Sequence, residues 1–271
     1  MERRKRVSGA VASRRSFGRR RAVGLGVVLA ALFSFIPHAV QACELRAGWA
    51  VFEPFQVPNG NAPPAGLDMD ILRRVVADAG CAIIEYRETP WPRLLPEIKS
   101  GRIDVITSSS FTKARAEYGR YSIPFRSVTY AAVYHNDAPK PGDRIGLEAA
   151  FAGDPMIGVI RGAYIPPAIR KVLDDAKSRG RLYEGIDYDT ILVLLEKERL
   201  DMIVAEVIDP RSAFRHIADN RAFQALEIDG NTDDIHLLFS RKTVGSDVVE
   251  RINAAIAAFR KTDAYGALFK R

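Results

Sequence analysis

The stretch 102–124 holds the side chains of this chain that are best suited to chemistry. An apolar run at 103–107 is predicted to be a short strand, and the loop expected after it has hydroxyls at 108–110 and at Thr112, with Arg115 three residues later. Hydroxyls and loop amides are neutral donors, and a guanidinium is a planar fork that can hold a carboxylate at two points. The pattern indicates that this stretch binds an anionic group of a small molecule.

Other kinds of site are less well supported. The serines lack a G-x-S-x-G context, so they have no nucleophile elbow around them. The histidines at 135, 216 and 236 are far apart and lack metal-ligand spacing. No glycine-rich phosphate loop is present. We therefore expect no catalytic residues, no metal and no cofactor.

Residues 1–42 are predicted to be an export signal that is cleaved near Ala42. An arginine-rich region precedes an apolar segment at 22–36, which is shorter than the length typical of a membrane-spanning helix. The sequence S-R-R-S-F at 13–17 favours twin-arginine export, and an ordinary Sec signal is the alternative. The expected location of the mature protein is the periplasm.

The excess of positive charge belongs to this signal. The chain has 40 Lys+Arg and 33 Asp+Glu, and residues 1–42 hold nine of the former and one of the latter. The remaining chain has 31 and 32, a net charge of −1. The composition is therefore no evidence for nucleic-acid binding, which requires a basic face on the folded domain.

Cys43 and Cys81 are the two cysteines of the chain, and each immediately precedes a predicted parallel strand. Neighbouring parallel strands start at the same sheet edge, so the two thiols can meet. An oxidising compartment favours a disulfide between them. Lipidation of Cys43 is the alternative, although Val-Gln-Ala-Cys is a poor lipobox.

Strands and helices alternate along the chain, which predicts βαβ units and parallel sheets. In the first series Asp68 or Asp70 caps a helix that Gly80 ends, and Pro92 opens a helix that Gly101 closes. A boundary is expected at 136–142. The later predictions are strands at 156–160, 200–204 and 235–240, and helices opened by Pro166, capped by Thr190, and at 247–259 and 263–269.

An internal similarity predicts two lobes of the same design. L-L-P-E-I-K-S-G-R-I-D-V-I at 94–106 aligns without gaps to I-L-V-L-L-E-K-E-R-L-D-M-I at 191–203. Ligands of α/β sheets sit beyond the carboxyl ends of the strands. We therefore expect ligand-facing segments at Ser108 and at Ala205–Glu206, one on each wall of a shared cleft.

Over nearly all of 43–271 the chain resembles the family 3 extracellular solute-binding proteins, the polar amino-acid receptors of ABC importers. The motifs that carry the resemblance are F-E-P-F (52–55), G-L-D-M-D-I (66–71), W-P-R-L-L-P-E-I-K-S-G-R-I-D-V-I (91–106), S-S-S-F-T-K-A-R (108–115), Y-S-I-P-F (121–125) and R-L-D-M-I-V-A-E (199–206). The resemblance implies two α/β lobes of the type II periplasmic-binding-protein fold, each a mainly parallel sheet flanked by helices, joined by two hinge strands. We assign lobe 1 to 43–134, lobe 2 to 135–231, and a return to lobe 1 at 232–271.

The resemblance also implies roles for individual residues. The expected ligand-binding residues are Phe52, Trp91, Ser108, Ser110, Arg115, Arg161, Gly162 and Glu206. Arg115 matches the arginine that grips the ligand α-carboxylate, and Glu206 matches the acid, usually Asp, that takes the α-ammonium. Ser108 and Ser110 match serines that bind the charged ends.

The aromatic and backbone roles follow in the same way. Phe52 and Trp91 match aromatics that sandwich the ligand side chain, and Arg161 and Gly162 sit where lobe 2 offers backbone donors. The alternative role of Arg115 is a surface ion pair, and that of Trp91 is packing in the core. For Glu206 the alternatives are a helix cap and an ion pair with Arg211. Phe55 has the same chemistry as Phe52.

Two departures from the family pattern bear on the ligand. Tyr164 stands where the family often has Thr or Ser. Basic-amino-acid binders carry an acid near the start of the first loop, where this chain reads Trp49-Ala50-Val51. We therefore expect an aromatic and apolar pocket around a polar clamp, and no lysine or arginine ligand.

The expected function is a monomeric periplasmic protein, not an enzyme, that captures an amino acid or similar small carboxylate between two closing lobes. The partners implied are this small molecule and an inner-membrane ABC permease. The alternatives are a cyclohexadienyl or arogenate dehydratase-like enzyme on the same fold, and a receptor that reports ligand occupancy to a membrane kinase.

Overall fold

The computed structural model describes residues 43–135, 144–208 and 223–269, in two α/β lobes. The predicted export signal at 1–42 and the predicted boundary at 136–142 lie outside the described residues. No helix in the described part of the chain is long and apolar enough to cross a membrane.

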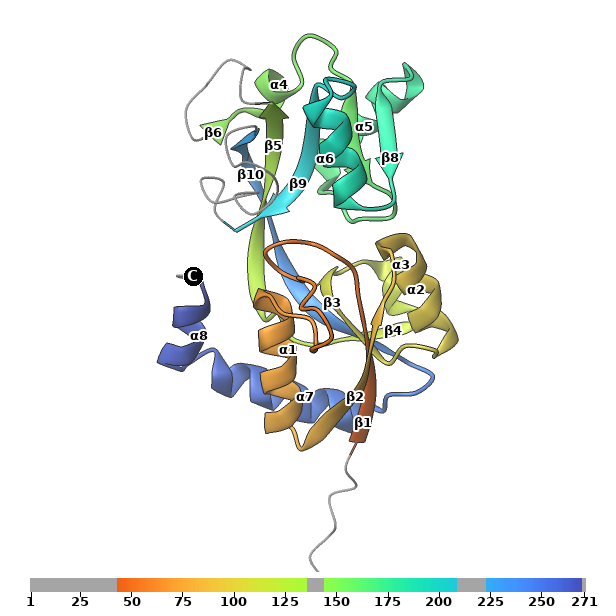
Figure 1. Cartoon of the computed structure of the whole chain (residues 1–271), viewed down its shortest axis with the longest axis vertical. Helices are drawn as coiled ribbons and strands as arrows, with labels where there is room; N and C mark the ends of the chain where they lie inside the picture. The colour runs from red at the N-terminus through yellow and green to blue at the C-terminus, as the bar shows by residue number, and fades with distance from the viewer. Residues whose placement is uncertain (1–42, 136–143, 209–222, 270–271) are drawn as a thin grey trace, which may run out of the picture. The chain divides into compact units, whose positions relative to one another are not determined.

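Lobe 1 contains a sheet in the order β2-β1-β3-β10, with β1 parallel to both β2 and β3 and β10 antiparallel to β3. Helices α1 and α7 pack against each other beside this sheet (Figure 1). The elements of lobe 1 are β1 (Cys43–Trp49), α1 (Leu67–Asp78), β2 (Cys81–Glu88), α2 (Trp91–Ser100), β3 (Val105–Ser110), α3 (Lys113–Ala116), β4 (Gly119–Tyr121), α7 (Ser246–Phe259) and α8 (Asp263–Leu268).

Lobe 2 repeats the same design with fewer strands. Its sheet has β9 and β8 on either side of β7, all parallel. Its elements are β6 (Arg144–Ile145), α4 (Leu147–Ala150), β7 (Ile157–Ile160), α5 (Pro167–Ser178), β8 (Leu182–Gly185), α6 (Tyr188–Glu196) and β9 (Met202–Val207). The strand β8 follows α5 and was not expected from the sequence.

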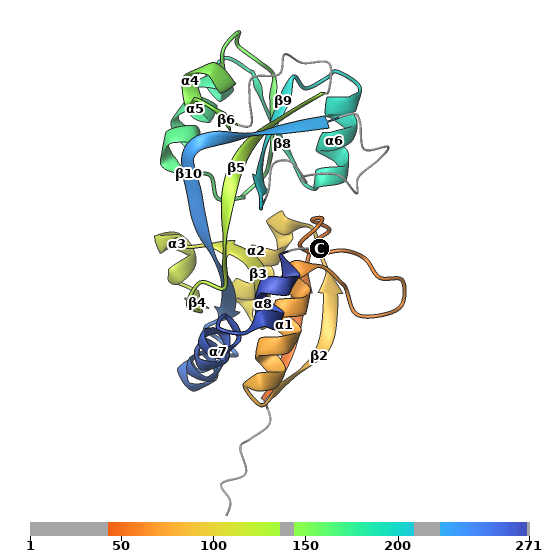
Figure 2. The same ribbon diagram turned by 90° about the vertical axis from the view of Figure 1, so that its left-hand side faces the viewer.

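Two long antiparallel strands, β5 (Arg126–His135) and β10 (Phe223–Ser240), run from one lobe into the other (Figures 1 and 2). The prediction of a strand at 235–240 captured only the end of β10. The register between the two strands shifts between Glu227 and Thr232, in a stretch rich in turn-forming residues. Residues 228–231 have no register partner in β5, and Gly230 has φ 72°, so the chain bulges there between two paired segments of β10.

Cys43 and Cys81 form a disulfide, as predicted, with their Cα atoms 4.6 Å apart. They are the first residues of β1 and β2 and face each other in the parallel register. The bond ties the outer strand pair of lobe 1 at its starting edge.

Two predicted helix caps are wrong. Neither Asp68 nor Asp70 caps α1: Gly66 is the N-cap, with φ 102°, and a Cβ there would lie 2.6 Å from the Phe55 carbonyl oxygen. Only glycine avoids that clash. Helix α6 is capped by the Asp187 carboxylate, which accepts from the backbone N–H of Thr190, the residue predicted to cap it. In both cases the helix starts earlier than the sequence pattern indicated.

The boundaries of α2 agree with the prediction from the sequence, since Pro92 lies in the first turn and Gly101 ends the helix at φ 81°. Strand β3, by contrast, begins later than predicted and extends to Ser110. The serines at 108–110 therefore belong to a buried strand instead of a loop. The positions of these serine side chains are therefore fixed by the pairing of β3 within the sheet.

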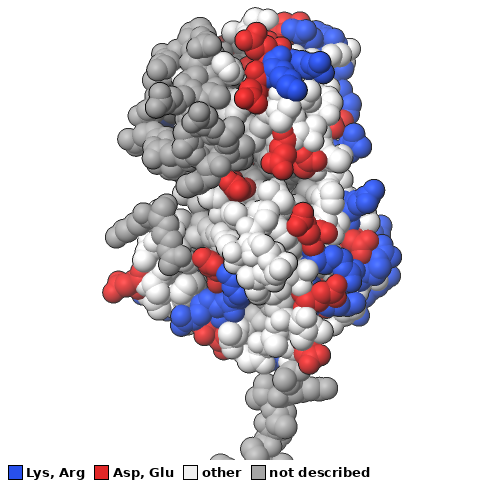
Figure 3. Space-filling view, viewed as in Figure 1, with Lys and Arg blue, Asp and Glu red and all other residues white. Residues whose placement is uncertain are grey.

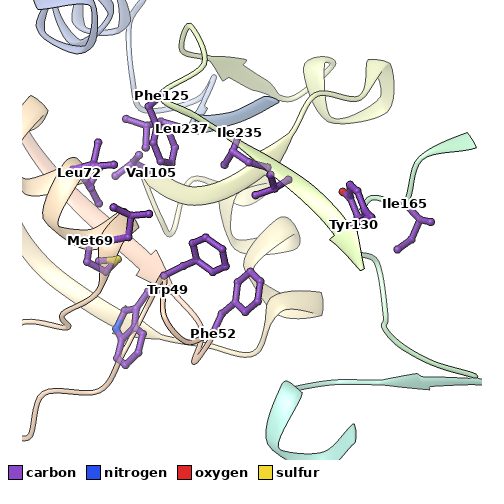
Figure 4. Close-up of a cluster of buried hydrophobic side chains, with 14 of the residues drawn as sticks. Trp49, Phe52, Met69, Leu72, Val105, Phe125, Tyr130, Ile165, Ile235 and Leu237 are labelled. Atoms are coloured by element: carbon purple, nitrogen blue, oxygen red, sulfur yellow. The ribbon is translucent and has the colours of Figure 1, made fainter. Parts of the chain in front are cut away.

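The largest apolar cluster passes through both lobes. It includes Leu72, Met69 and Val105 in lobe 1, and it continues past Tyr130 on β5 to Ile165 (Figure 4). On the face shown in Figure 3, acidic and basic side chains are interspersed over the surface of both lobes.

Candidate functional site

A cavity of about 250 Å³ lies between the two lobes. Drug-sized pockets measure about 300–1,000 Å³, so this cavity suits a small solute. It is lined by Ala50, Val51, Phe52, Gln56, Glu88, Thr89, Pro90, Trp91, Ser108, Ser110, Arg115, Ile160, Ala163, Tyr164, Ile186, Asp187, Tyr188, Asp189 and Glu206. The ligand-facing segments expected at Ser108 and at Glu206 thus border one space.

Arg115 is the one cation among the residues that line the cavity. It lies in the short helix α3, whose N-cap Thr112 accepts from the Arg115 backbone N–H at 3.1 Å. Its side chain donates to the carbonyls of Ser110 (3.1 Å) and Gly162 (2.9 Å), and its guanidinium lies 5.5 Å from the centre of the Trp91 ring.

These contacts hold the guanidinium of Arg115 in place without neutralising it. A guanidinium has five N–H donors, and two are used here, so donors remain for a carboxylate. Arg115 is only 6% exposed, and it forms no ion pair with any acid in the described part of the chain. The alternative of a surface ion pair for Arg115 therefore does not fit the structure.

The two serines of β3 have different surroundings. The Ser108 hydroxyl donates to the Asp68 carboxylate and accepts from the Gln56 amide at 2.9 Å. Its backbone has φ 52°, in the left-handed region that few non-glycine residues adopt. Ser110 contributes its carbonyl to Arg115.

Glu206 supplies an acid from β9, beside Tyr130 in the register with β5. The Tyr130 hydroxyl lies 3.4 Å from one carboxylate oxygen of Glu206, and the other oxygen, Oε2, is buried with no hydrogen-bond partner among the described residues. Burial raises the pKa of Glu206 to about 7. The charges that also act on this carboxyl are those of Arg126, Asp68, Asp233 and Arg115.

The effect of these charges depends on their sign. The two arginines lower the pKa of Glu206 and the two aspartates raise it, and burial outweighs each of them. A cation brought to Oε2 would favour the charged carboxylate in the same way as the arginines do. Arg211, the pairing partner considered from the sequence, lies outside the described residues.

Aromatic rings form the sides of the cavity. Phe52 stacks on Tyr188 of lobe 2 with ring centres 4.5 Å apart and planes 4° apart, and it also contacts Phe55 at 4.7 Å. Trp91 begins α2 and lines the cavity beneath the guanidinium of Arg115. Of these two phenylalanines, Phe52 lines the cavity and Phe55 does not.

Arg161 and Gly162 do not line the cavity. The backbone N–H of Arg161 donates to the Gly185 carbonyl at 2.8 Å, so it is already used within lobe 2. Gly162 contributes an acceptor, because its carbonyl receives the hydrogen bond from Arg115. The backbone N–H of Arg161 is therefore already used within lobe 2, whereas the expected donor at Gly162 stays a prediction.

Sequence reasoning missed several lining residues. Asp187 and Tyr188 lie at the start of α6, whereas the sequence pattern predicts that this helix begins later, at Thr190. The Asp-Tyr pair before an apolar helix is the signal that identifies them. Glu88 and Asp189 also line the cavity, so its wall is more acidic than the aromatic and apolar pocket that was expected. Gln56, which is buried beside Ser108, carried no recognisable motif.

Curated relatives with similar sequences are two proteins described as probable histidine-binding proteins. One, from Campylobacter jejuni, is 25% identical over 231 residues, which cover 84% of each chain. The other, from Neisseria gonorrhoeae, is 25% identical over 158 residues. That match covers 58% of this chain and 56% of the relative.

Solved structures with the same fold include an ancestral arginine-binding protein bound to arginine, with a TM-score of 0.70, 21% identity, and coverage of 84% of this chain and 96% of that one. The arginine-, lysine-, histidine-binding protein ArtJ of Geobacillus stearothermophilus gives a TM-score of 0.65 at 15% identity, with coverage of 85% and 94%. A histidine kinase sensor domain similar to periplasmic binding proteins gives 0.68 at 19% identity, with coverage of 84% and 94%.

At these identities the solved structures establish the fold alone, which is that of periplasmic binding proteins. The sequence profile of the bacterial extracellular solute-binding proteins, family 3, matches residues 45–271, nearly all of the described chain. This family consists of binding proteins that act outside the cytoplasm, which agrees with the solute-sized cavity. The chain belongs to the bacterial extracellular solute-binding proteins of family 3.

Proposed function

We propose that this protein is a periplasmic receptor that captures an amino acid, or a similar small carboxylate, between its two lobes and delivers it to an ABC importer. The α-carboxylate binds the free donors of Arg115, and the α-ammonium binds Glu206. The side chain of the ligand lies between Phe52 and Trp91. Closing of the lobes follows from a ligand that touches both walls.

The observation that carries this proposal is that Arg115 and Glu206 line the same small cavity from different lobes. They are close enough for the Arg115 charge to lower the pKa of Glu206. A zwitterion carries opposite charges at a fixed separation and satisfies both residues at once. Each charge-assisted hydrogen bond in such a site contributes about 1.5–3 kcal/mol.

Other observations agree with the wider role. The disulfide suits an oxidising compartment, as does the export signal expected at 1–42. The names of the two curated relatives make L-histidine the first amino acid to test. The importer is the partner that the family resemblance implies, and we expect the protein to meet it as a monomer.

The test is calorimetry of the purified protein with each of the twenty L-amino acids, preceded by a thermal-shift screen. We expect one amino acid or a chemically related group to bind and to raise the melting temperature. Its C-terminal amide and its N-acetyl derivative should each bind at least tenfold more weakly, because each removes one charge of the zwitterion.

The two derivatives are the matched controls, since they keep the side chain and differ at one end. Equal affinity for the amino acid and its amide would contradict the role of Arg115. Equal affinity for the N-acetyl derivative would contradict the role of Glu206. Absence of binding by all twenty amino acids and by their 2-oxo and 2-hydroxy acids would contradict the proposed function.

A second candidate function is a dehydratase-like enzyme on the same fold, and the observation that favours it is the carboxyl of Glu206. A buried acid with a pKa near 7 suits a general acid at neutral pH. Incubation with arogenate or prephenate separates the two functions. Product formation that Glu206→Gln abolishes would favour the enzyme, and unchanged substrate would favour the receptor.

A further inference from the structure

The indole N–H of Trp91 is a buried hydrogen-bond donor that has no acceptor in the described part of the chain. Trp91 begins α2 and lines the cavity from the lobe 1 side. An indole nitrogen can only donate, and it usually finds an acceptor when it is buried. The proposed contacts of a zwitterion with Arg115 and Glu206 do not account for this donor.

The surroundings of the Trp91 ring explain why its nitrogen has no partner among the described residues. The ring packs against one apolar cluster that includes Leu94 and Ile98 of lobe 1, and against another that includes Ile160 of lobe 2. These side chains have no acceptor. The guanidinium of Arg115, 5.5 Å from the ring centre, has donors alone. An acceptor for Nε1 therefore has to come from the contents of the cavity.

Trp91 lies where the side chain of a bound amino acid is expected. In the proposed function this side chain lies between Phe52 and Trp91, while the charged ends of the solute go to Arg115 and Glu206. The Phe52 ring has no polar atom, and it stacks on Tyr188. Of the two rings beside the solute side chain, Trp91 alone can donate a hydrogen bond to it.

The charges of the lining residues limit which acceptor fits. Three acids, Glu88, Asp187 and Asp189, line the cavity, and Arg115 is the one cation among the lining residues. A side-chain carboxylate has acceptors, but these acids repel it. An ammonium or a guanidinium suits the acids but has no acceptor to offer Trp91. An amide or a neutral imidazole has an acceptor for the indole and a donor for the acids.

We propose that the indole nitrogen of Trp91 is a specificity-determining donor, which selects solutes whose side chain carries a neutral hydrogen-bond acceptor beside a donor, as an amide or an imidazole does. This inference rests on the proposed function and deepens it, because it names the class of side chain. An apolar side chain leaves the indole donor buried and unpaired, which weakens its binding. Trp91 is then more than an aromatic surface for stacking.

The experiment uses sets of amino acids that share a shape and differ in polarity. L-asparagine, L-aspartate and L-leucine form the first set, and L-glutamine, L-glutamate and L-2-amino-5-methylhexanoate form a longer one. L-histidine and 3-(2-thienyl)-L-alanine compare an imidazole with a ring of the same size that has no N–H. Calorimetry gives the affinities for the wild type. In at least one set, the amide or the imidazole should bind at least tenfold more tightly than its partners.

The variant Trp91→Phe removes the indole nitrogen and keeps an aromatic ring. The readout is the affinity for the amide or imidazole divided by that for its apolar partner, in the set that binds most tightly. We expect this ratio to fall at least fivefold in Trp91→Phe. The matched control is Trp49→Phe, because Trp49 is 6% exposed and does not line the cavity. The control should leave the ratio within twofold of the wild type.

An unchanged ratio in Trp91→Phe would overturn the inference. An equal loss of affinity for both solutes gives such a ratio, and it would mean that the ring or the α-carboxylate is the site of the contact. The inference also fails if the wild type binds the apolar member of every set as tightly as the polar one. Failure of every amino acid to bind the wild type would contradict the proposed function as well, whereas binding with an unchanged ratio would contradict the inference alone.

A second measurement needs no variant of Trp91. The chain has two tryptophans, so the indole proton that remains in the NMR spectrum of Trp49→Phe is that of Trp91. We expect this proton to shift downfield when the tightest-binding amide or imidazole is added, and not when its apolar partner is added. Equal shifts with both solutes would overturn the inference even if Trp91→Phe did not fold.

Discussion

The two walls of the cavity differ in charge. The lobe 1 wall contains Arg115, the hydroxyls at the end of β3 and one acid, Glu88, whereas the lobe 2 wall contains Glu206 and the acids at the start of α6 and no cation. In the proposed function, a solute that bridges the walls has its negative end at Arg115 in lobe 1 and its positive end at Glu206 in lobe 2.

The walls are alike in another respect, because each has buried polar atoms without a hydrogen-bond partner. In lobe 1, Arg115, Ser108 and Gln56 make hydrogen bonds within the protein, but Ser110 Oγ and Trp91 Nε1 have no partner among the described residues. In lobe 2, Oε2 of Glu206 has no partner among the described residues. The comparison teaches that the two walls differ in charge and that both retain polar atoms which the described part of the protein does not satisfy.

The largest expected effect concerns the disulfide, which stiffens lobe 1 alone. Closing a loop of 38 residues stabilises by about 4 kcal/mol in the chain-entropy model. Cys43→Ala with Cys81→Ala should therefore lower the melting temperature and speed hydrogen exchange in β1 and β2. The parallel pair β7 and β8 of lobe 2 is the internal control, and exchange there should not change. Equal melting temperatures of the variant and the wild type would contradict the prediction.

The next effect tests the lobe 2 wall through pH. The folded pKa of Glu206 is about 7, above its ordinary value of 4.5. A raised carboxyl pKa stabilises the folded protein below pH 4.5, and this contribution is lost as the pH rises through 7, by up to about 3 kcal/mol. Glu206→Gln should remove this pH dependence from the free energy of unfolding, as measured by urea denaturation at several pH values.

Binding should depend on pH in the opposite sense. The deprotonated carboxylate takes the ammonium, so affinity for the amino acid should rise with pH up to about 7 and level off above it. Below that pH it should fall by about tenfold per unit. Affinity that is constant between pH 5 and pH 8 would show that Glu206 does not bind the ammonium.

A fourth prediction tests the lobe 1 wall. Arg115→Ala should weaken amino-acid binding at least tenfold in calorimetry, because it removes charge-assisted hydrogen bonds worth about 1.5–3 kcal/mol each. The matched control is Arg161→Ala, an exposed arginine near the cavity that does not line it. If both variants bound the amino acid as tightly as the wild type, the role of Arg115 in the lobe 1 wall would be contradicted.

The smallest effect concerns the contact between the walls. Phe52→Leu removes the stack on Tyr188 and should weaken binding by about 0.5–1.5 kcal/mol, or about 2- to 10-fold. Phe111→Leu is the control, because Phe111 is 52% exposed, contacts Tyr121 and lies outside the cavity. Equal losses in the two variants would show that the effect is not specific to the stack.

Much of the lobe 1 wall could be predicted from the sequence. The hydroxyls and Arg115 lie within eight residues, and a strand followed by a short capped helix is enough to bring them together. The repeated pattern at 94–106 and 191–203 pointed to Glu206, because equivalent strands of two similar lobes end at equivalent places. The boundaries of helices and strands were the weaker part, as at α1, α6 and β3.

The long strands and the buried ion pair of Arg126 with Asp68 could not be predicted in this way. The turn-forming residues at 228–231 bulge out of the ladder, and β10 continues past them only because β5 pairs with the segments on either side. Arg126 and Asp68 are 58 positions apart, and neither belongs to a pattern that names the other as its partner. Local periodicity carries no information about such contacts.

The amino-acid sequence by itself determined the alternation of strands and helices, the only possible cysteine pair, and the cluster of donors around Arg115, because these depend on neighbours along the chain. Only the tertiary structure decided that Ser108 gives its hydrogen to Asp68, that Phe52 stacks on Tyr188, and that burial raises the pKa of Glu206 to about 7. Desolvation and hydrogen-bond saturation depend on groups from distant segments, and folding alone brings those segments together.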